Sequence, residues 1–273
     1  MNRKISKVAV LGSGIMGSGI ACHFANIGVE VLLLDITPKK LNETEIKKNL
    51  SIDSKVVKNR IVNEMFNKCV KSKPSPIYNK KFLNRVQLGN YDDDIKKICE
   101  ADWIIEVVVE KLSIKKTIFD LVEKHRAKGT IVTSNTSGIP IKLMNEGRSD
   151  DFKKHFAITH FFNPPRYLNL FEVIPGPNCD KDILDFLIKY GEDFLGKTSV
   201  LAKDTPAFIG NRIGIYGIMS LFHQLRDGGF SIEEIDKFTG PAIGRPKSAT
   251  FRTADIACLL YTSDAADDTP CVD

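Results

Sequence analysis

Short apolar runs alternate with helix-periodic segments along the chain up to about residue 202. The runs predicted as strands are 8–11, 31–34, 101–110, 130–133, 156–162, 170–174 and 198–202, with a further short element at 86–88. The segments predicted as helical are 18–28, 38–73, 113–126 and 181–194. Strands that alternate with helices are typical of α/β folds, so the pattern predicts a Rossmann-type, doubly wound sheet.

Three local features mark the ends of elements. The Lys-Pro-Ser-Pro cluster at 73–76 ends the second helical segment. The three successive aspartates at 92–94 predict an acidic turn, and Ser113 is a plausible N-cap for the third helical segment.

The pattern becomes purely helical from Pro206 onward. This change predicts a boundary near 203–205, between a sheet domain of residues 1–204 and a smaller all-α domain of residues 205–257.

The first predicted strand, turn and helix carry a specific pattern. Gly12, Gly14 and Gly17 follow residues 8–11 directly, and Asp35 closes the second predicted strand. This is the order of a dinucleotide-binding βαβ unit. Gly12 permits the tight turn, Gly14 lets backbone N–H groups approach a pyrophosphate, and Gly17 lets the helix lie close to the sheet. The helix N-terminus would stabilise the phosphate charge.

Asp35 indicates which dinucleotide would bind. Its carboxylate would accept hydrogen bonds from the ribose hydroxyls and repel a 2′-phosphate, which favours NAD over NADP. Lys39 and Lys40 lie nearby in the sequence and weaken that preference. A glycine-rich turn without a ligand is the alternative, and the agreement of strand, helix and spaced acid argues against it.

The composition is that of a soluble globular protein. Hydrophobic residues make up 42% and charged residues 27% of the 273-residue chain. No apolar run is long enough to span a bilayer, and the polar start leads straight into the first strand, so we expect a cytoplasmic protein. The six cysteines are scattered without a CxxC pair, which disfavours a metal site or a disulfide framework.

The net charge of +5 is unevenly spread. Residues 39–85 hold thirteen Lys or Arg against four acids. A solvated face of one or two exposed helices is one interpretation, and a landing surface for an anionic ligand such as a phosphorylated carrier is the other. Nucleic acid is disfavoured, because the run lacks interleaved aromatics and matches no recognition motif.

Residues 258–273 differ in character from what precedes them, with four Asp and no Lys or Arg. The string CLLYTSDAAD resembles an in-frame translation of a transposase adapter used in sequencing libraries. We therefore expect 258–273 to be a non-native read-through tail, and the helical domain before it to be truncated.

Three further motifs follow the glycine turn: SNTSG at 134–138, THFFNPP at 159–165 and KDTPAFIGNR at 203–212. Together the four motifs resemble the 3-hydroxyacyl-CoA dehydrogenase family over residues 5–257, and the wording is closest to dehydrogenase parts that can be fused to an enoyl-CoA hydratase domain. The resemblance implies an NAD-dependent oxidoreductase of fatty acid β-oxidation. Its reaction is the reversible oxidation of a (3S)-3-hydroxyacyl-CoA to the 3-ketoacyl-CoA. The implied partners are an acyl-CoA substrate and, in the intact protein, a second copy or a fused hydratase domain.

His160 and Glu172 are the candidate catalytic pair. His160 ends a predicted strand, and an imidazole can take a proton from an alcohol and return it at neutral pH. Glu172 is an acid within an apolar strand, where a carboxylate needs a partner because burying it alone is costly. A core histidine bonded to the backbone is the alternative for His160. The pair also matches the family's catalytic positions.

The resemblance assigns roles to further residues. Ser137 and Asn211 match positions that hydrogen-bond the reacting oxygen and the thioester region of the substrate. Ser137 has the additional possible role of capping the short helix after Gly138, and Asn211 that of a polar residue on an early helical turn.

Four more residues match the cofactor side of the site. Glu110 and Lys115 match family positions near the nicotinamide and its ribose, and Asn135 and Asn163 are expected to contact the cofactor as well. No residues are expected to bind a metal.

Two other functions stay open at this point. One is a non-catalytic NAD-binding or structural relative, against which the intact His160, Glu172, Ser137 and Asn211 argue. The other is an NAD-dependent dehydrogenase of a free β-hydroxy acid. Such enzymes share the glycine turn, but they typically use a catalytic lysine on a later helix, and the THFFNPP motif disfavours them.

Overall fold

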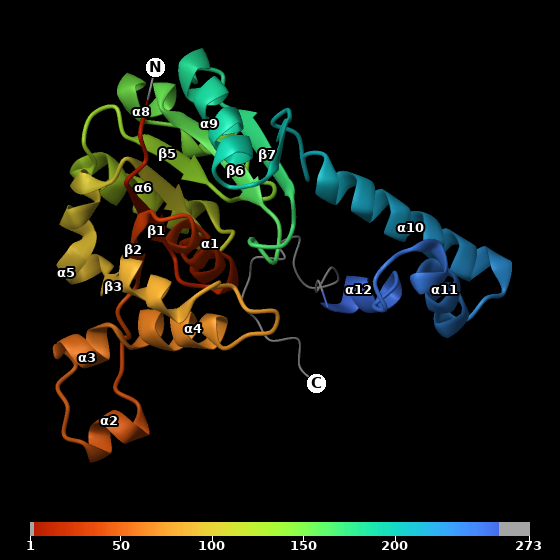
Figure 1. The fold of residues 1–273 in the computed structure, drawn as a ribbon, viewed down its shortest axis with the longest axis horizontal. Coiled ribbons are helices and arrows are strands. Elements are labelled where there is room, and N and C mark those ends of the chain that lie inside the picture. The colour runs from red at the N-terminus through yellow and green to blue at the C-terminus, as the bar shows by residue number, and fades with distance from the viewer. Residues whose placement is uncertain (1–2, 257–273) are drawn as a thin grey trace.

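The computed structural model describes residues 3–256, and an eight-stranded sheet forms its centre (Figure 1). The strands are β1 Lys7–Leu11, β2 Glu30–Asp35, β3 Val86–Asn90, β4 Trp103–Glu106, β5 Ile131–Ser134, β6 Phe156–Phe161, β7 Leu170–Pro175 and β8 Thr198–Leu201. The helices are α1 Ile15–Asn26, α2 Glu43–Lys47, α3 Lys55–Lys58, α4 Arg60–Val70, α5 Tyr91–Asp94, α6 Leu112–His125, α7 Ile141–Met144, α8 Asp150–Lys154, α9 Lys181–Asp193, α10 Gly210–Gly228, α11 Ile232–Thr239 and α12 Phe251–Ile256. Three 3-10 turns complete the elements: η1 Lys80–Arg85, η2 Ile95–Glu100 and η3 Pro241–Ile243. The predicted Rossmann-type sheet is confirmed.

The strand order is β3-β2-β1-β4-β5-β6-β7-β8, and the strands from β3 to β6 in this order are parallel. β7 runs antiparallel to β6, and β8 is parallel to β7. The reversal follows from chain length, because residues 162–169 are too few for the crossover that a parallel neighbour requires. It places residues of β6 and β7 directly opposite each other at the carboxyl edge of the sheet.

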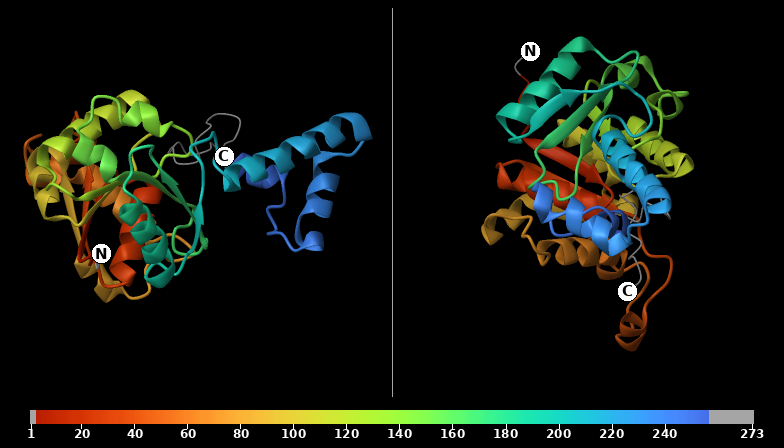
Figure 2. Two further views of the ribbon diagram at one scale, coloured as in Figure 1. Left: turned by 90° about the horizontal axis from the view of Figure 1, so that it is seen from above. Right: turned by 90° about the vertical axis from the view of Figure 1, so that its right-hand side faces the viewer.

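Helices lie on both faces of the sheet (Figure 2), and buried apolar side chains fill the space between each helical layer and the sheet. On one face α1, α4 and α9 pack over a cluster that includes Phe24, Trp103 and Tyr190. On the other face α6, α7 and α8 pack over a cluster that includes Phe119 and Phe156. Because both faces are buried, the strands consist almost entirely of apolar residues.

Two predicted elements differ in extent from what the structure shows. The apolar run at 101–110 leaves the sheet after Glu106, because the neighbouring strands β1 and β5 end there and offer no further partners. The polar segment at 38–73 forms three separate helices, α2 to α4, and Asn49, in the turn after α2, has a φ of +50°. Its amphipathic pattern is strongest in α4, where Val62 and Phe66 are buried.

Two predictions about the ends of elements were wrong. The aspartates at 92–94 lie in the short helix α5, which the Asn90 side chain caps by accepting from Asp93 N. The N-cap of α6 is Lys111, so Ser113 lies inside the first turn and does not cap the helix.

After β8 the described chain contains only helices and the turn η3. Figures 1 and 2 show α10 extending away from the sheet, with α11 and α12 folded back beside it. Within residues 3–256, no helix combines the length and the apolar character needed to cross a membrane.

Candidate active site

The glycine turn between β1 and α1 is closely packed. Gly12 has a φ of +108°, and a Cβ there would lie 2.5 Å from the carbonyl oxygen of Val107. A Cβ on Gly17 would lie 1.9 Å from the carbonyl oxygen of Gly12. Neither position accepts a side chain, so these two glycines let the turn fold against both the helix and the segment after β4.

The helix that follows this turn starts without a side-chain cap. Gly14 is the N-cap residue of α1, and no side chain accepts a hydrogen bond there. An uncapped helix N-terminus at the carboxyl edge of a parallel sheet is a suitable place for a phosphate group.

Asp35 lies at the end of β2, next to the glycine turn. Its Oδ2 accepts hydrogen bonds from Ser13 N at 2.6 Å and Ser13 Oγ at 2.5 Å, and its Oδ1 accepts from Ile36 N at 2.7 Å. The carboxylate is therefore oriented by the turn itself, and Oδ1, which accepts a single hydrogen bond here, keeps a lone pair for a ribose hydroxyl.

His160 and Glu172 face each other across the antiparallel pair β6 and β7. His160 Nδ1 lies 2.7 Å from Glu172 Oε2, and both residues are buried. Burial alone would raise the pKa of Glu172, but hydrogen bonds from His160 and from the Gly210 and Ile209 N–H groups lower it below its usual value. Glu172 is therefore a carboxylate and can only accept, so Nδ1 carries the proton and Nε2 is left as the basic nitrogen.

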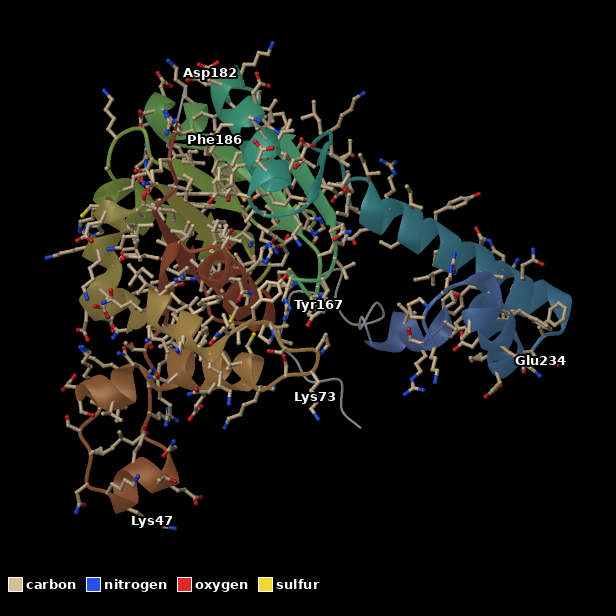
Figure 3. The ribbon with its side chains drawn as sticks, in the orientation of Figure 1. Lys47, Lys73, Tyr167, Asp182, Phe186 and Glu234 are labelled. Atoms are coloured by element: carbon tan, nitrogen blue, oxygen red, sulfur yellow. The ribbon has the colours of Figure 1, made fainter. Side chains whose placement is uncertain are left out.

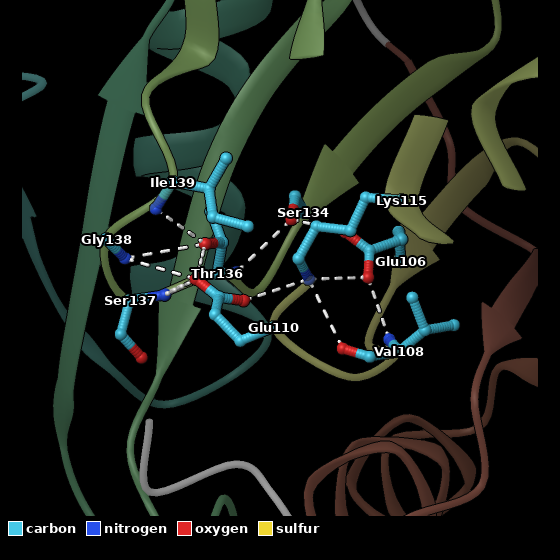
Figure 4. Close-up of polar contacts among 9 residues, drawn as sticks. All are labelled: Glu106, Val108, Glu110, Lys115, Ser134, Thr136, Ser137, Gly138 and Ile139. Carbon is cyan, nitrogen blue, oxygen red and sulfur yellow. Dashed lines mark hydrogen bonds and ion pairs between the residues drawn. The ribbon is translucent and has the colours of Figure 1, made fainter. Parts of the chain in front are cut away.

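A buried polar cluster lies at the ends of β4 and β5, and β5 is the neighbour of β6 in the sheet (Figure 4). The Lys115 ammonium is 2.8 Å from Glu106 Oε1, 3.1 Å from Glu110 Oε2 and 3.2 Å from the Val108 carbonyl oxygen. Burial would lower its pKa, but the two carboxylates outweigh this and raise the pKa above its usual value, so Lys115 stays charged. Its three N–H groups thus each have a protein acceptor, which makes Lys115 a residue that orients Glu110.

The second carboxylate oxygen of Glu110 is held by the SNTSG loop. Its Oε1 accepts hydrogen bonds from the Thr136 hydroxyl, from Ser137 N at 3.2 Å and from Gly138 N at 3.3 Å. Figure 4 shows the Ser137 hydroxyl pointing away from these contacts. Ser137 does not cap the following helix, because the N-cap of α7 is Pro140.

The remaining predicted residues lie at the same edge of the sheet. Asn135 is buried and accepts a hydrogen bond from Phe161 N at 2.8 Å, which ties β5 to β6. Asn163 is exposed in the loop that follows β6. Asn211 is half-buried in the first turn of α10, next to Gly210, whose N–H is bonded to Glu172.

Comparison with known proteins identifies the family of this chain. Residues 7–205 match the model of the 3-hydroxyacyl-CoA dehydrogenase NAD-binding domain. The chain belongs to the 3-hydroxyacyl-CoA dehydrogenase family. The family model describes an NAD-binding domain, so the predicted cofactor is confirmed as NAD.

Curated relatives extend this finding. A probable 3-hydroxyacyl-CoA dehydrogenase of Bacillus subtilis is 56% identical over 259 residues, which are 95% of this chain and 33% of the relative. A putative fatty acid oxidation complex trifunctional enzyme of Rickettsia prowazekii is 34% identical over 256 residues, 94% of this chain and 34% of the relative. The chain thus spans about a third of the length of both proteins.

A solved structure shows the same fold. The (S)-3-hydroxybutyryl-CoA dehydrogenase of Ralstonia eutropha superposes with a TM-score of 0.69 at 24% identity, covering 94% of this chain and 83% of that one.

The basic segment of this family member extends from the sheet, with Lys47 at its far end (Figure 3). Arg60, one of its cations, is held by Glu45 Oε2 at 2.6 Å and by the Lys40 carbonyl oxygen at 2.8 Å. The Ser54 hydroxyl is buried without a hydrogen-bond partner. Arg60 therefore stabilises the contact between α2 and α4, and most of the lysines remain on the surface.

A large cleft of about 1090 Å³ lies elsewhere, between the N-terminal strand ends and α9, where Figure 3 labels Asp182 and Phe186. It is lined by the starts of β1 and β2, at Lys7 and Glu30, whereas His160 lies at the carboxyl end of β6. The cleft is therefore not the site of the catalytic pair.

Three site residues were missed by sequence reasoning. Glu106 and Thr136 anchor Lys115 and Glu110, and Phe208 packs its ring on His160 with centroids 5.5 Å apart. The acid at the end of β4, nine residues before a lysine, was a detectable sign of the ion pair. Nothing in the local sequence places Phe208 against His160.

Proposed function

We propose that this chain is the dehydrogenase portion of an enzyme that reversibly oxidises a (3S)-3-hydroxyacyl-CoA to the 3-ketoacyl-CoA in fatty acid β-oxidation. The observation that carries the proposal is the buried His160–Glu172 pair, with its 2.7 Å contact, at the carboxyl edge of a dinucleotide-binding sheet. Ligands of such sheets bind at this edge.

His160 is the base of the proposed reaction. Its Nε2 takes the proton of the substrate hydroxyl during oxidation and returns it during reduction. Glu172 holds the ring through Nδ1 and stabilises the imidazolium that forms. The Ser137 hydroxyl and the Asn211 amide bind the reacting oxygen and the thioester region, where charge develops.

The residues of the glycine turn fit NAD. The uncapped start of α1 suits the pyrophosphate, and the Asp35 carboxylate suits the adenosine ribose. Glu110, with Asn135 and Asn163 nearby, serves the nicotinamide side, and Lys115 contributes by orienting Glu110. When bound, NAD supplies the hydride acceptor, while the protein supplies orientation and the base.

The helical part is proposed as an incomplete copy of the family's C-terminal domain, covering residues 205–257. In support, several of its large apolar side chains are exposed, among them Ile213, Tyr216 and Phe238. Further C-terminal residues, a second copy or a fused hydratase domain would cover them, in keeping with the much greater length of the curated relatives. The proposed tail at 258–273 lies outside the described residues.

The test is an NADH absorbance assay with acetoacetyl-CoA. It compares the chain ended at residue 257 with a chimera that continues into the homologous segment of the Bacillus subtilis relative. We expect activity in the chimera, and His160→Ala in the chimera should lower kcat by about 10³-fold with NADH binding unchanged.

Other results would change the proposal. A chimera that binds NADH but does not turn over acetoacetyl-CoA would favour the non-catalytic NAD-binding protein. Turnover of a free 3-hydroxy acid in preference to the CoA thioester would favour the free-acid dehydrogenase. Activity in the chain ended at residue 257 would show that the missing helices are dispensable.

A further inference from the structure

The turn that joins the sheet to α10, residues 205–210, contacts both His160 and Glu172. Glu172 uses Oε2 for His160, and its Oε1 accepts hydrogen bonds from Gly210 N at 2.7 Å and from Ile209 N at 3.0 Å. Both N–H groups lie at the start of α10, where the helix itself provides no acceptors for them. The same carboxylate therefore joins the base to the first turn of the helical region.

The backbone of this turn is strained. Ala207 has a φ of +62° and Phe208 a φ of +44°, in the left-handed region that residues with a Cβ rarely adopt. A strained backbone of this kind persists only where its surroundings hold it, and such positions cluster at functional sites. Here the strain turns the Ile209 and Gly210 N–H groups toward Glu172 and buries the Phe208 ring.

The Phe208 ring packs against the His160 imidazole. Its ring centroid is 5.5 Å from that of His160, and Phe162 packs on the same imidazole at 4.5 Å. Gly210 allows the Phe162 ring to lie this close to the start of α10, because a Cβ on residue 210 would lie 2.8 Å from that ring. Among the described residues, the only ion pair of either member is the one between them, so the polar surroundings of Glu172 are His160 and the two N–H groups.

We propose that residues 205–210 are a positioning element of the catalytic pair, through which the orientation of α10 sets the hydrogen bonding of Glu172 and the packing of His160. The inference rests on the proposed function and extends it, because it makes the base dependent on where the helical region sits. Phe208 is a positioning residue, and the Gly210 N–H is a positioning group. Both act on His160 without touching the reacting atoms.

The first experiment removes one N–H donor and leaves every side chain unchanged. Cell-free synthesis with glycolic acid at position 210 converts the Gly210 amide to an ester, so Glu172 loses its 2.7 Å donor. The matched control places glycolic acid at Gly214, one turn further along the same helix, where nothing lies within 4 Å of a Cβ position. Both changes delete one backbone donor of α10, and only the first faces the pair.

The expected result is a change in protonation. A carboxylate that has lost one donor holds a proton more strongly, and it also stabilises the neighbouring imidazolium more. Both effects raise the pH at which activity is lost on the acid side. In the position-210 ester, the acid limb of kcat/KM should move up by about one pH unit, and the Gly214 ester should match the unmodified protein. Coincidence of all three profiles would overturn the inference.

A second readout does not need turnover. The NMR titration of the His160 ring, assigned with His160→Gln, should show the same upward shift in the position-210 ester alone. If acetoacetyl-CoA is not a substrate, the proposed function fails, and this titration still decides the inference. Equal midpoints in the three proteins would refute it.

Phe208 provides a third measurement, which does not depend on ester synthesis. Phe208→Ala should lower kcat by about tenfold and leave KM within twofold, since a misplaced base slows the chemical step. Phe208→Leu restores most of the bulk on the ring and should recover most of kcat. Equal kcat values for the Ala and Leu variants and the unmodified protein would contradict a positioning role.

Discussion

The sheet region and the helical region that follows it differ in how they bury their apolar residues. In the sheet region the largest apolar side chains, such as Trp103, Phe24 and Phe119, are fully buried between strands and helices. In the helical region Ile213 is 67% exposed and Phe238 is 58% exposed. The first region completes its core from its own residues, whereas the second leaves apolar faces that the described residues do not cover.

The proposed catalytic pair lies where these two regions meet. His160 and Glu172 belong to the sheet, but two of the three hydrogen-bond donors to Glu172 come from the first residues of α10. The sheet region therefore supplies both members of the pair, and the first turn of α10 supplies two of the donors that hold Glu172. The five predictions that follow test this division.

The largest effect is expected from a core substitution in the sheet region. Phe119 is fully buried and packs edge-on against Phe152 and Phe156, at 5.6 and 5.3 Å between centroids. Phe119→Ala should lower the free energy of unfolding by about 4 kcal/mol. Urea unfolding followed by fluorescence of Trp103, the single tryptophan, measures this.

The matched variant in the helical region is Phe222→Ala. Phe222 packs on Phe251 at 4.9 Å, but it is 36% exposed. We expect this substitution to lower the free energy of unfolding of the helical region by about 1 kcal/mol. The urea midpoint of the Trp103 transition should stay unchanged. Equal shifts of the Trp103 transition for both variants would show that the two regions unfold as one unit.

The second-largest loss of stability is expected from the buried ion cluster. Lys115→Met leaves the Glu106 and Glu110 carboxylates without their cation, and should destabilise the sheet region by about 3 kcal/mol. NADH affinity should fall as well, because Glu110 loses its orientation. Lys116→Met is the control, since Lys116 pairs with Glu146 on the surface and should change both quantities far less. A normal NADH affinity in Lys115→Met would contradict the orienting role.

The next effect depends on pH. The hydrogen bonds to Glu172 lower its pKa below the usual 4.5, so their contribution to stability is complete above pH 4.5 and is lost as the pH falls through the lowered pKa. Glu172→Gln has no such carboxylate, so its stability should fall less steeply below pH 4.5 than that of the unmodified protein. Urea midpoints measured over this range test the slope, and parallel curves would show that Glu172 is not tied to its donors in solution.

The smallest effect on stability is expected on the exposed face of α10. Ile213→Gln replaces a side chain that is 67% exposed with another good helix former, so the free energy of unfolding should change by less than about 0.5 kcal/mol. Self-association, measured by sedimentation velocity, should decrease, because less apolar surface is presented. A large loss of stability would instead mean that this face is already covered in solution.

Much of the sheet region was predictable from the sequence, because its information is local. The apolar runs of β1, β2 and β6 and the glycine turn each depend on neighbouring residues, and their predicted and observed bounds nearly coincide. The family match confirms NAD as the cofactor. The pairing of His160 with Glu172 was predicted from a histidine and an acid twelve residues apart on consecutive strands, and the contact is present.

The tertiary structure decided the features that depend on contacts between distant segments. The strand predicted at 101–110 ends at Glu106 because its neighbouring strands end there. Lys115 is enclosed by Glu106, Glu110 and Val108, and no local propensity encodes these contacts. The same holds for the turn before α10. Its N–H groups and the Phe208 ring reach His160 and Glu172 from residues far along the chain, and only the folded arrangement of sheet and helix brings them together. Local sequence thus determined which residues are candidates for the chemistry, while long-range packing determined what holds them in position.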